Sequence, residues 1–265
     1  MRFKDQVAVI TGTSSGNGRA IALALAAQGA RVVCSDLVRQ ARTEGYETDI
    51  DVDTDELIRR AGQQSIFVKA DAANSADMQN LVQQAVEHFG RLDIMVNNAG
   101  IFTTLQTIVE ETEEDYDLTM NVNAKGVWLG CKYAITQMLK QPPRANGCRG
   151  RIINVSSIGG LVGLALEPAY CASKGAVNNL TRQLAVDFAP HKININAICP
   201  GFLETAMVRP ALDNPELKAH LDSLTPWPRI GTAQDVAKAV AFLASDDAQW
   251  MTGSMLTVDG AFTAQ

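Results

Sequence analysis

The stretch VAVITGTSSGNG, residues 7–18, decides the fold of this chain. Its first five residues are apolar or β-branched, which is typical of a buried strand. Three glycines follow at positions 12, 16 and 18, and residues 19–28 then predict an Ala-rich apolar helix that ends at Gly29. Glycines permit a tight turn and a close approach of the backbone, and the start of a helix can bind a pyrophosphate. The spacing G-x3-G-x-G differs from the commoner G-x-G-x-x-G, and an ordinary glycine-rich turn is the alternative.

Strands and helices alternate along the rest of the chain. Besides residues 7–11, apolar runs predict strands at 31–35, 65–69, 92–96, 151–156, 193–198 and 255–258. The stretches between them predict helices near 17–28, 53–62, 75–89, 113–139, 168–188 and 233–244. Such alternation predicts an α/β three-layer Rossmann fold: a doubly wound parallel sheet of about seven strands with helices on both faces, in a single domain over residues 1–265. Right-handed crossovers bring the carboxyl ends of the strands to one edge, where ligands bind.

An acidic residue ends the second predicted strand. Asp36 follows Gly18 by 18 residues. An acid at this place binds both hydroxyls of an adenosine ribose and repels a 2′-phosphate, so it favours NAD over NADP. Arg39 and Arg42 argue the other way, because either could bind that phosphate. NADP therefore stays open as a cofactor.

Tyr170 and Lys174 stand four residues apart in a predicted helix. Residues at this spacing lie on one helix face. A nearby cation lowers the pKa of a phenol from its usual value of about 10. Such a phenol can exchange a proton with an alcohol or a ketone near neutral pH. The same spacing also occurs on solvated helix faces, so the pair needs support from elsewhere in the chain.

That support is a resemblance to the short-chain dehydrogenase/reductase family over essentially the whole chain. Besides the Tyr170–Lys174 pair, the matching motifs occur in the family's order: Thr11–Gly18, Asn97–Gly100, Asn123, Ser157, Pro200–Gly201 and Val258–Gly260. The resemblance implies an NAD(P)-dependent oxidoreductase that transfers a hydride between nicotinamide and a secondary alcohol or ketone. It also implies a small-molecule substrate and an assembly that is a homotetramer, or at least a dimer.

The resemblance implies four catalytic residues. Tyr170 is the general acid or base, and Lys174 lowers its pKa and binds the nicotinamide ribose. Ser157 binds the substrate oxygen and stabilises its developing charge. Asn123 holds a water that links Lys174 to solvent.

It also implies a set of cofactor-binding residues on the motifs and at strand ends. They are Gly12, Ser14, Ser15, Gly16, Asn17, Gly18, Asp36, Asp71, Ala72, Asn98, Ala99, Gly100, Tyr170, Lys174, Pro200, Gly201, Leu203 and Thr205. Among these, Asp71 is expected at the adenine edge and Thr205 at the carboxamide of the nicotinamide.

The substrate is expected under a lid at about residues 202–228, which in this family is variable. The expected substrate residues are Ser157, Glu167, Tyr170, Phe202, Met207 and Trp227. An apolar lid favours an alcohol or ketone with an apolar body. Glu167 instead suits sugar hydroxyls, or is simply an acid favoured at a helix N-terminus. Prolines in the lid should interrupt regular helix and leave it mobile before ligands bind.

Two further classes remain as alternatives. One is a sugar or polyol dehydrogenase of the same fold, such as a glucose 1-dehydrogenase. The other is a non-catalytic dinucleotide-binding regulator, which the intact Asn123, Ser157, Tyr170 and Lys174 argue against. A sugar epimerase or dehydratase also uses Y-x-x-x-K, but those relatives usually carry another glycine spacing and a longer C-terminal region.

Composition limits the remaining choices. A net charge of −6 provides no basic surface for nucleic acid, and no apolar run reaches the roughly 18 residues that cross a membrane. The first strand begins almost at once, so we expect no signal peptide. Five cysteines without C-x-x-C predict reduced thiols in the cytoplasm, and three scattered histidines predict no metal site. Residues 39–52 and 141–150 look like surface insertions, and the first should lie near the adenosine, where it modifies cofactor grip.

Overall fold

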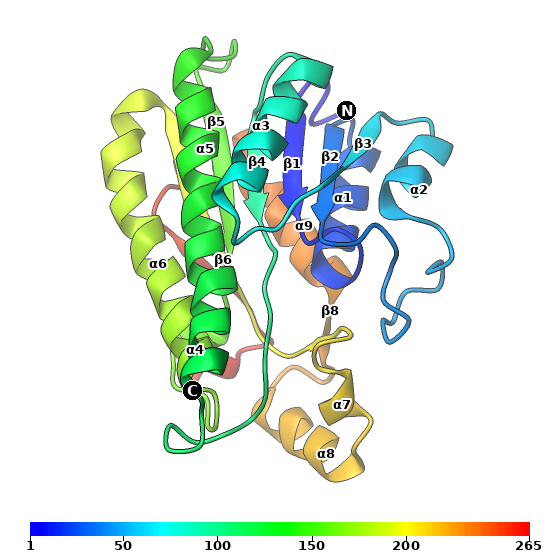
Figure 1. The fold of residues 1–265 in the computed structure, drawn as a ribbon, viewed down its shortest axis with the longest axis vertical. Coiled ribbons are helices and arrows are strands. Elements are labelled where there is room, and N and C mark those ends of the chain that lie inside the picture. Colours follow the sequence, from blue (N-terminus) through cyan, green and yellow to red (C-terminus); the bar gives the residue numbers. More distant parts are fainter.

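The computed structural model describes residues 1–265 and has a seven-stranded parallel sheet at its centre (Figure 1). The strand order is β3-β2-β1-β4-β5-β6-β9. The strands are β1 (Val7–Thr11), β2 (Arg31–Asp36), β3 (Ser65–Lys69), β4 (Ile94–Asn97), β5 (Gly150–Val155), β6 (Ile193–Pro200) and β9 (Met255–Val258). The predicted strands are confirmed to within two residues at each end. The order reverses beside β1, and in sheets of this kind ligands bind at such a switch point.

Helices cover both faces of the sheet. They are α1 (Gly16–Ala27), α2 (Thr54–Arg60), α3 (Ser75–Phe89), α4 (Glu113–Met120), α5 (Gly126–Lys140), α6 (Pro168–Phe188), α7 (Arg209–Leu212), α8 (Pro215–Leu224) and α9 (Ala233–Leu243). Alternate residues of the strands point to opposite faces, so the core divides in two. Ala8 and Ile10 of β1 pack with α1 and α9, whereas Val7 and Val9 pack with the helices of the other face. Every residue of β1 is buried, as expected for a parallel strand covered on both sides.

The helical stretch predicted near 113–139 is confirmed, and it contains one feature that the sequence did not predict. α4 and α5 are separated by a π-helical turn over Asn121–Lys125. A π-helical turn interrupts the regular i→i−4 ladder, and such turns are frequent at functional sites. Here Asn123 lies within the turn, is fully buried, and exchanges two hydrogen bonds with the backbone of Ile101 at 2.8 and 2.9 Å. These contacts attach the turn to the loop after β4.

The segment after β6 forms a small projecting unit beyond the carboxyl edge of the sheet (Figure 1). A two-stranded parallel pair, β7 (Leu203–Glu204) with β8 (Gly231–Thr232), closes its base. In the sequence, α7 and α8 come between these two strands. The expectation that prolines interrupt helix here is wrong for Pro210 and Pro215. Both stand in the first turn of a helix, where the missing N–H is not needed.

The two predicted insertions are both loops, but neither is a free surface segment. Arg144, in the second insertion, forms an ion pair with the buried Asp93 at 2.7 Å. The first insertion packs on α1, where the buried guanidinium of Arg19 donates to the carbonyls of Asp49 and Val52 at 2.7 and 2.9 Å. No helix of the protein has both the length and the apolar character needed to cross a membrane.

Candidate active site

The glycine turn between β1 and α1 has the conformation that its sequence predicts. Gly12 and Gly16 adopt φ values of +71° and +56°, in the left-handed region that favours glycine. A Cβ on Gly18 would lie 1.9 Å from the Gly12 carbonyl oxygen, so no larger residue fits there. The side-chain oxygen of Asn17 is buried at this turn without a hydrogen-bond partner. A close-fitting turn at a helix start, where N–H groups lie outside the helical ladder, suits a dinucleotide pyrophosphate.

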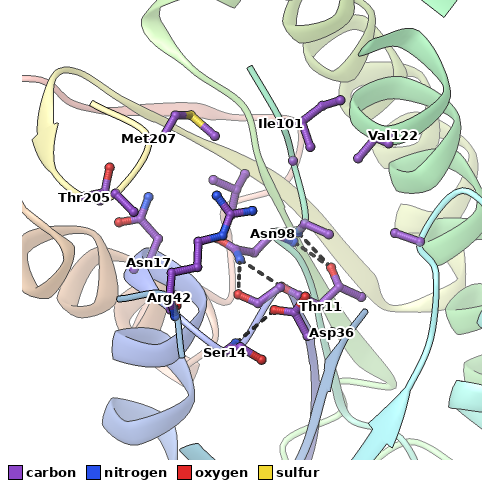
Figure 2. Close-up of a pocket in the computed structure, with 18 of the residues that line it drawn as sticks. Thr11, Ser14, Asn17, Asp36, Arg42, Asn98, Ile101, Val122, Thr205 and Met207 are labelled. Carbon is purple, nitrogen blue, oxygen red and sulfur yellow. Dashed lines mark hydrogen bonds between the residues drawn. The ribbon is translucent and has the colours of Figure 1, made fainter. Parts of the chain in front are cut away.

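Asn98 holds this turn in place (Figure 2). Its side-chain amide donates to the carbonyls of Thr11 and Gly12 at 2.8 and 3.1 Å. The Thr11 hydroxyl in return accepts the backbone N–H groups of Asn98 and Ala99, both at 3.0 Å. The N-N-A-G segment, which follows the neighbouring strand β4, therefore holds the glycine turn in place through hydrogen bonds. Thr11 is a positioning residue that sequence reasoning did not single out.

Asp36 lies beside the same turn at the end of β2. Its carboxylate accepts the N–H of Ser14 at 3.0 Å (Figure 2) and that of Leu37 at 2.8 Å. These two contacts fix the carboxylate in the wall of the cavity. Arg42 lines the same cavity, so an acid and a base both face the region expected to hold the adenosine ribose. Arg39 is instead held by Asp55 at 2.7 Å and does not line it.

One cavity of about 410 Å³ joins the glycine turn to Tyr170 and Lys174. All of the predicted cofactor residues line it except Gly18, which underlies the turn. Figure 2 shows Thr205 and Met207 on one side of this space and Ile101 and Val122 on the other. The strand ends therefore converge as the parallel topology requires. Sequence reasoning missed several residues of the lining, among them Leu37, Val38, Gln40, Ile101, Val122, Ser156, Ala206 and Val208.

Tyr170, Ser157 and Lys174 come together at the inner end of the cavity. Burial raises the pKa of Tyr170 to about 12, while hydrogen bonding to Ser157 acts in the opposite direction. Burial also lowers the pKa of Lys174 to about 8. The ammonium nitrogen lies 5.6 Å from the centre of the Tyr170 ring and donates to the Val155 carbonyl at 3.0 Å. Burial dominates the shift of the Tyr170 pKa, and Lys174 is not among its causes, so the expected lowering by the lysine stays a prediction.

Asn123 approaches Lys174 from behind the cavity. It does not line the cavity but lies beneath Gly100, where a Cβ would be 3.3 Å from Asn123 Oδ1 and 3.5 Å from Lys174 Nζ. Its amide nitrogen also donates to the Ser173 hydroxyl at 3.3 Å. The π-helical turn therefore places Asn123 near Lys174. The role of Asn123 in a proton relay stays a prediction.

The predicted substrate residues divide into two groups. Ser157, Tyr170 and Met207 line the cavity, whereas Glu167, Phe202 and Trp227 do not. Phe202 packs edge-on against Phe262 at 5.5 Å, and Trp227 is 61% exposed. Their roles in substrate binding would require the projecting unit to move.

Glu167 stands at the start of α6, close to Tyr170. Burial raises the pKa of its carboxyl to about 7, and its charge would raise that of Tyr170 further. It makes no capping hydrogen bond. Glu111 accepts the N–H of Ala169 instead, at 3.3 Å. Glu167 is the N-cap residue of α6, as expected for an acid favoured by the helix dipole. Its role in substrate binding stays a prediction.

Comparisons with known proteins agree with this architecture. The family model described as "Enoyl-(Acyl carrier protein) reductase" matches residues 12–263. A 2-(R)-hydroxypropyl-CoM dehydrogenase of Xanthobacter autotrophicus is 40% identical over 98% of this chain and 99% of its own. A cyclopentanol dehydrogenase of Comamonas sp. is 36% identical over 99% of both chains.

A solved structure with bound NADP, from Agrobacterium tumefaciens and described as a 2-deoxy-d-gluconate 3-dehydrogenase, superimposes with a TM-score of 0.84. It is 31% identical, and the match covers 99% of this chain and 98% of that one. The chain belongs to the short-chain dehydrogenase/reductase family, whose members bind a nicotinamide cofactor. It is an NAD(P)-dependent oxidoreductase that interconverts secondary alcohols and ketones.

Proposed function

We propose that the protein is an NAD-preferring dehydrogenase whose substrate is a secondary alcohol with an apolar body. The observation that carries this proposal is the single cavity that joins the glycine turn and Asp36 to Tyr170 and Lys174. The lining of this cavity includes the apolar residues Ile101, Val122 and Met207, which suit an apolar substrate. The cyclopentanol dehydrogenase among the relatives, 36% identical, is named for a substrate of this chemistry.

The proposed mechanism assigns each step to a residue of this chain. The nicotinamide, when bound, supplies or accepts the hydride. Tyr170 Oη gives a proton to the ketone oxygen in reduction and takes it back in oxidation. Ser157, which hydrogen-bonds the phenol, holds the substrate oxygen beside it. In oxidation Tyr170 must lose a proton from a pKa of about 12, so positive charge near the phenol assists.

We propose NAD rather than NADP because Asp36 is held in the cavity wall by two backbone N–H groups. A fixed carboxylate there repels a 2′-phosphate, and that phosphate would be buried beside it. Arg42 is the counter-argument, since it lines the same cavity, and a relative of known structure holds NADP. The ratio of kcat/KM for the two cofactors tests the choice, and a clear NADP preference would transfer the role to Arg42.

A sugar or polyol is the second candidate substrate. Glu167 favours it, because its carboxyl is near Tyr170 and makes no capping bond. A panel that compares cyclopentanol with glucose, read by absorbance of the reduced nicotinamide, separates the two classes. Glu167→Gln serves as the matched variant: it should impair only a hydroxyl-rich substrate. A non-catalytic regulator has no use for the assembled proton-transfer groups, so we do not favour it.

We propose further that the single domain acts as a cytoplasmic homotetramer. All five cysteines are free thiols, which suits a reducing compartment. Large side chains are exposed on α5, α6 and near the C-terminus: Trp128 at 46%, Val186 at 76% and Trp250 at 100%. Contacts between copies would remove this apolar surface from water. Light scattering should give a multiple of 28.5 kDa, and a monomer at micromolar concentration would exclude the assembly.

We also propose that residues 202–228 form the substrate lid. The unit projects beyond the sheet edge and joins it through the two-residue strands β7 and β8. Hydrogen exchange across this segment should slow when NAD and a substrate analogue bind together. Equal protection with and without these ligands would indicate a rigid, preformed site.

A further inference from the structure

The loop between β2 and α2 places an acid on the glycine turn. Residue Glu47 is half-buried, and its carboxylate accepts the backbone N–H of Gly16, the first residue of α1. Free N–H groups at the start of a helix attract anions. In this structure one of them is already taken by an anionic side chain from the same chain.

The contact is only partly satisfied. The second carboxylate oxygen of Glu47 is buried without a hydrogen-bond partner. The side-chain oxygen of Asn17, the residue after Gly16, is also buried without a partner. A buried acceptor without a donor costs free energy. The contact between Glu47 and Gly16 therefore carries a free-energy cost. That cost is relieved when the Glu47 carboxylate moves away from the turn, so another anion can replace it.

The loop is anchored at both ends, so movement is confined to its middle. At the start, Arg39 pairs with Asp55 at 2.7 Å. At the end, the buried Arg19 binds the carbonyls of Asp49 and Val52. Between these anchors lie residues 40–48, which include Glu47.

The tip of this loop is held by the projecting unit. Arg209, the first residue of α7, donates to the carbonyls of Glu44 and Gly45 at 3.0 and 3.2 Å. Its guanidinium also lies 5.3 Å from the centre of the Tyr46 ring. These contacts keep the loop, and with it Glu47, against the turn.

We propose that Glu47 is a built-in competitor for the pyrophosphate of the cofactor, and that residues 40–48 form a gate that Arg209 holds shut. The inference rests on the proposed cofactor site. A bound pyrophosphate and the Glu47 carboxylate are both anions that use the same helix N-terminus. Cofactor binding must displace the carboxylate and break the contacts between the loop tip and Arg209 of α7. Because α7 belongs to the proposed lid, cofactor entry also releases the lid to move.

The test is NADH affinity measured by nicotinamide fluorescence on the full-length protein, without turnover. Glu47→Gln retains an acceptor but removes the charge, and should tighten NADH binding by about two- to fivefold, the range for one charged contact at a helix N-terminus. Asp51→Asn is the matched control, because it removes an exposed charge from the same loop outside residues 40–48. It should leave the affinity unchanged.

Arg209→Ala provides a second variant that does not alter the turn itself. It should raise the NADH association rate in stopped-flow measurements, because the gate is no longer held. If the loop instead clamps the cofactor, both Glu47→Gln and Arg209→Ala will weaken NADH binding, and that sign overturns the proposal. Equal affinity of the wild type and Glu47→Gln also overturns it while leaving the cofactor site intact. Failure of the wild type and of every variant to bind NADH or NADPH would overturn the cofactor site itself, and the gate with it.

Discussion

Asn98 should contribute more to the free energy of unfolding than an ordinary partly buried amide, because it supports the glycine turn with two hydrogen bonds. Its side chain donates to the carbonyls of Thr11 and Gly12 at 2.8 and 3.1 Å. Each such bond contributes about 0.5–1.5 kcal/mol net to stability. Asn98→Ala should therefore lower the free energy of unfolding by roughly 1–3 kcal/mol and weaken NADH binding, since the turn that presents its N–H groups is loosened.

Asn98→Asp sharpens this prediction. It keeps the size of the side chain but places a carboxylate against two carbonyl oxygens, so it should destabilise more than the alanine variant. Denaturant unfolding measures both changes, and fluorescence titration with NADH reports on the turn. Asn80→Ala, an exposed amide of α3 without a side-chain hydrogen bond, is the matched control. A loss below about 0.5 kcal/mol for Asn98→Ala, or an aspartate variant as stable as wild type, would refute the reasoning.

Three further predictions concern the catalytic and cofactor groups. Tyr170→Phe should lower kcat by about 10² to 10⁴ with NADH affinity retained, and activity within about tenfold of wild type would remove Tyr170 from the proton transfer. Burial lowers the pKa of Lys174 from 10.5 to about 8, so between these values the contribution of Lys174 to stability rises with pH, while the buried thiols and Tyr170 act in the opposite direction; the stability of the wild type relative to Lys174→Met should therefore rise with pH in denaturant titrations, and a constant difference would show that Lys174 is not the cause. Asp36→Ala should reduce the ratio of kcat/KM for NAD over NADP, whereas an unchanged ratio would place cofactor choice elsewhere in the cavity.

The strands and most helices were predictable because their signals are local. Apolar runs such as residues 7–11 and 193–198 mark buried parallel strands, and the glycines at 12, 16 and 18 mark the turn. The helical stretch near 113–139 was predictable, but the π-helical turn within it was not, because apolar periodicity does not register one extra residue in a turn. The π-helical turn at Asn121–Lys125 is stabilised by Asn123 on Ile101, a contact between distant segments.

The sequence by itself determined the sheet, the glycine turn and the Tyr170–Lys174 pair, since these depend on residue type and short spacing. Only the tertiary structure decided how these groups behave. Enclosure by the surrounding chain raises the pKa of Tyr170 to about 12. Glu47 reaches Gly16 across 31 positions, and Arg209 reaches the same loop from α7. Desolvation and long-range contacts of this kind are properties of the packed chain, so no local pattern of residues contains them.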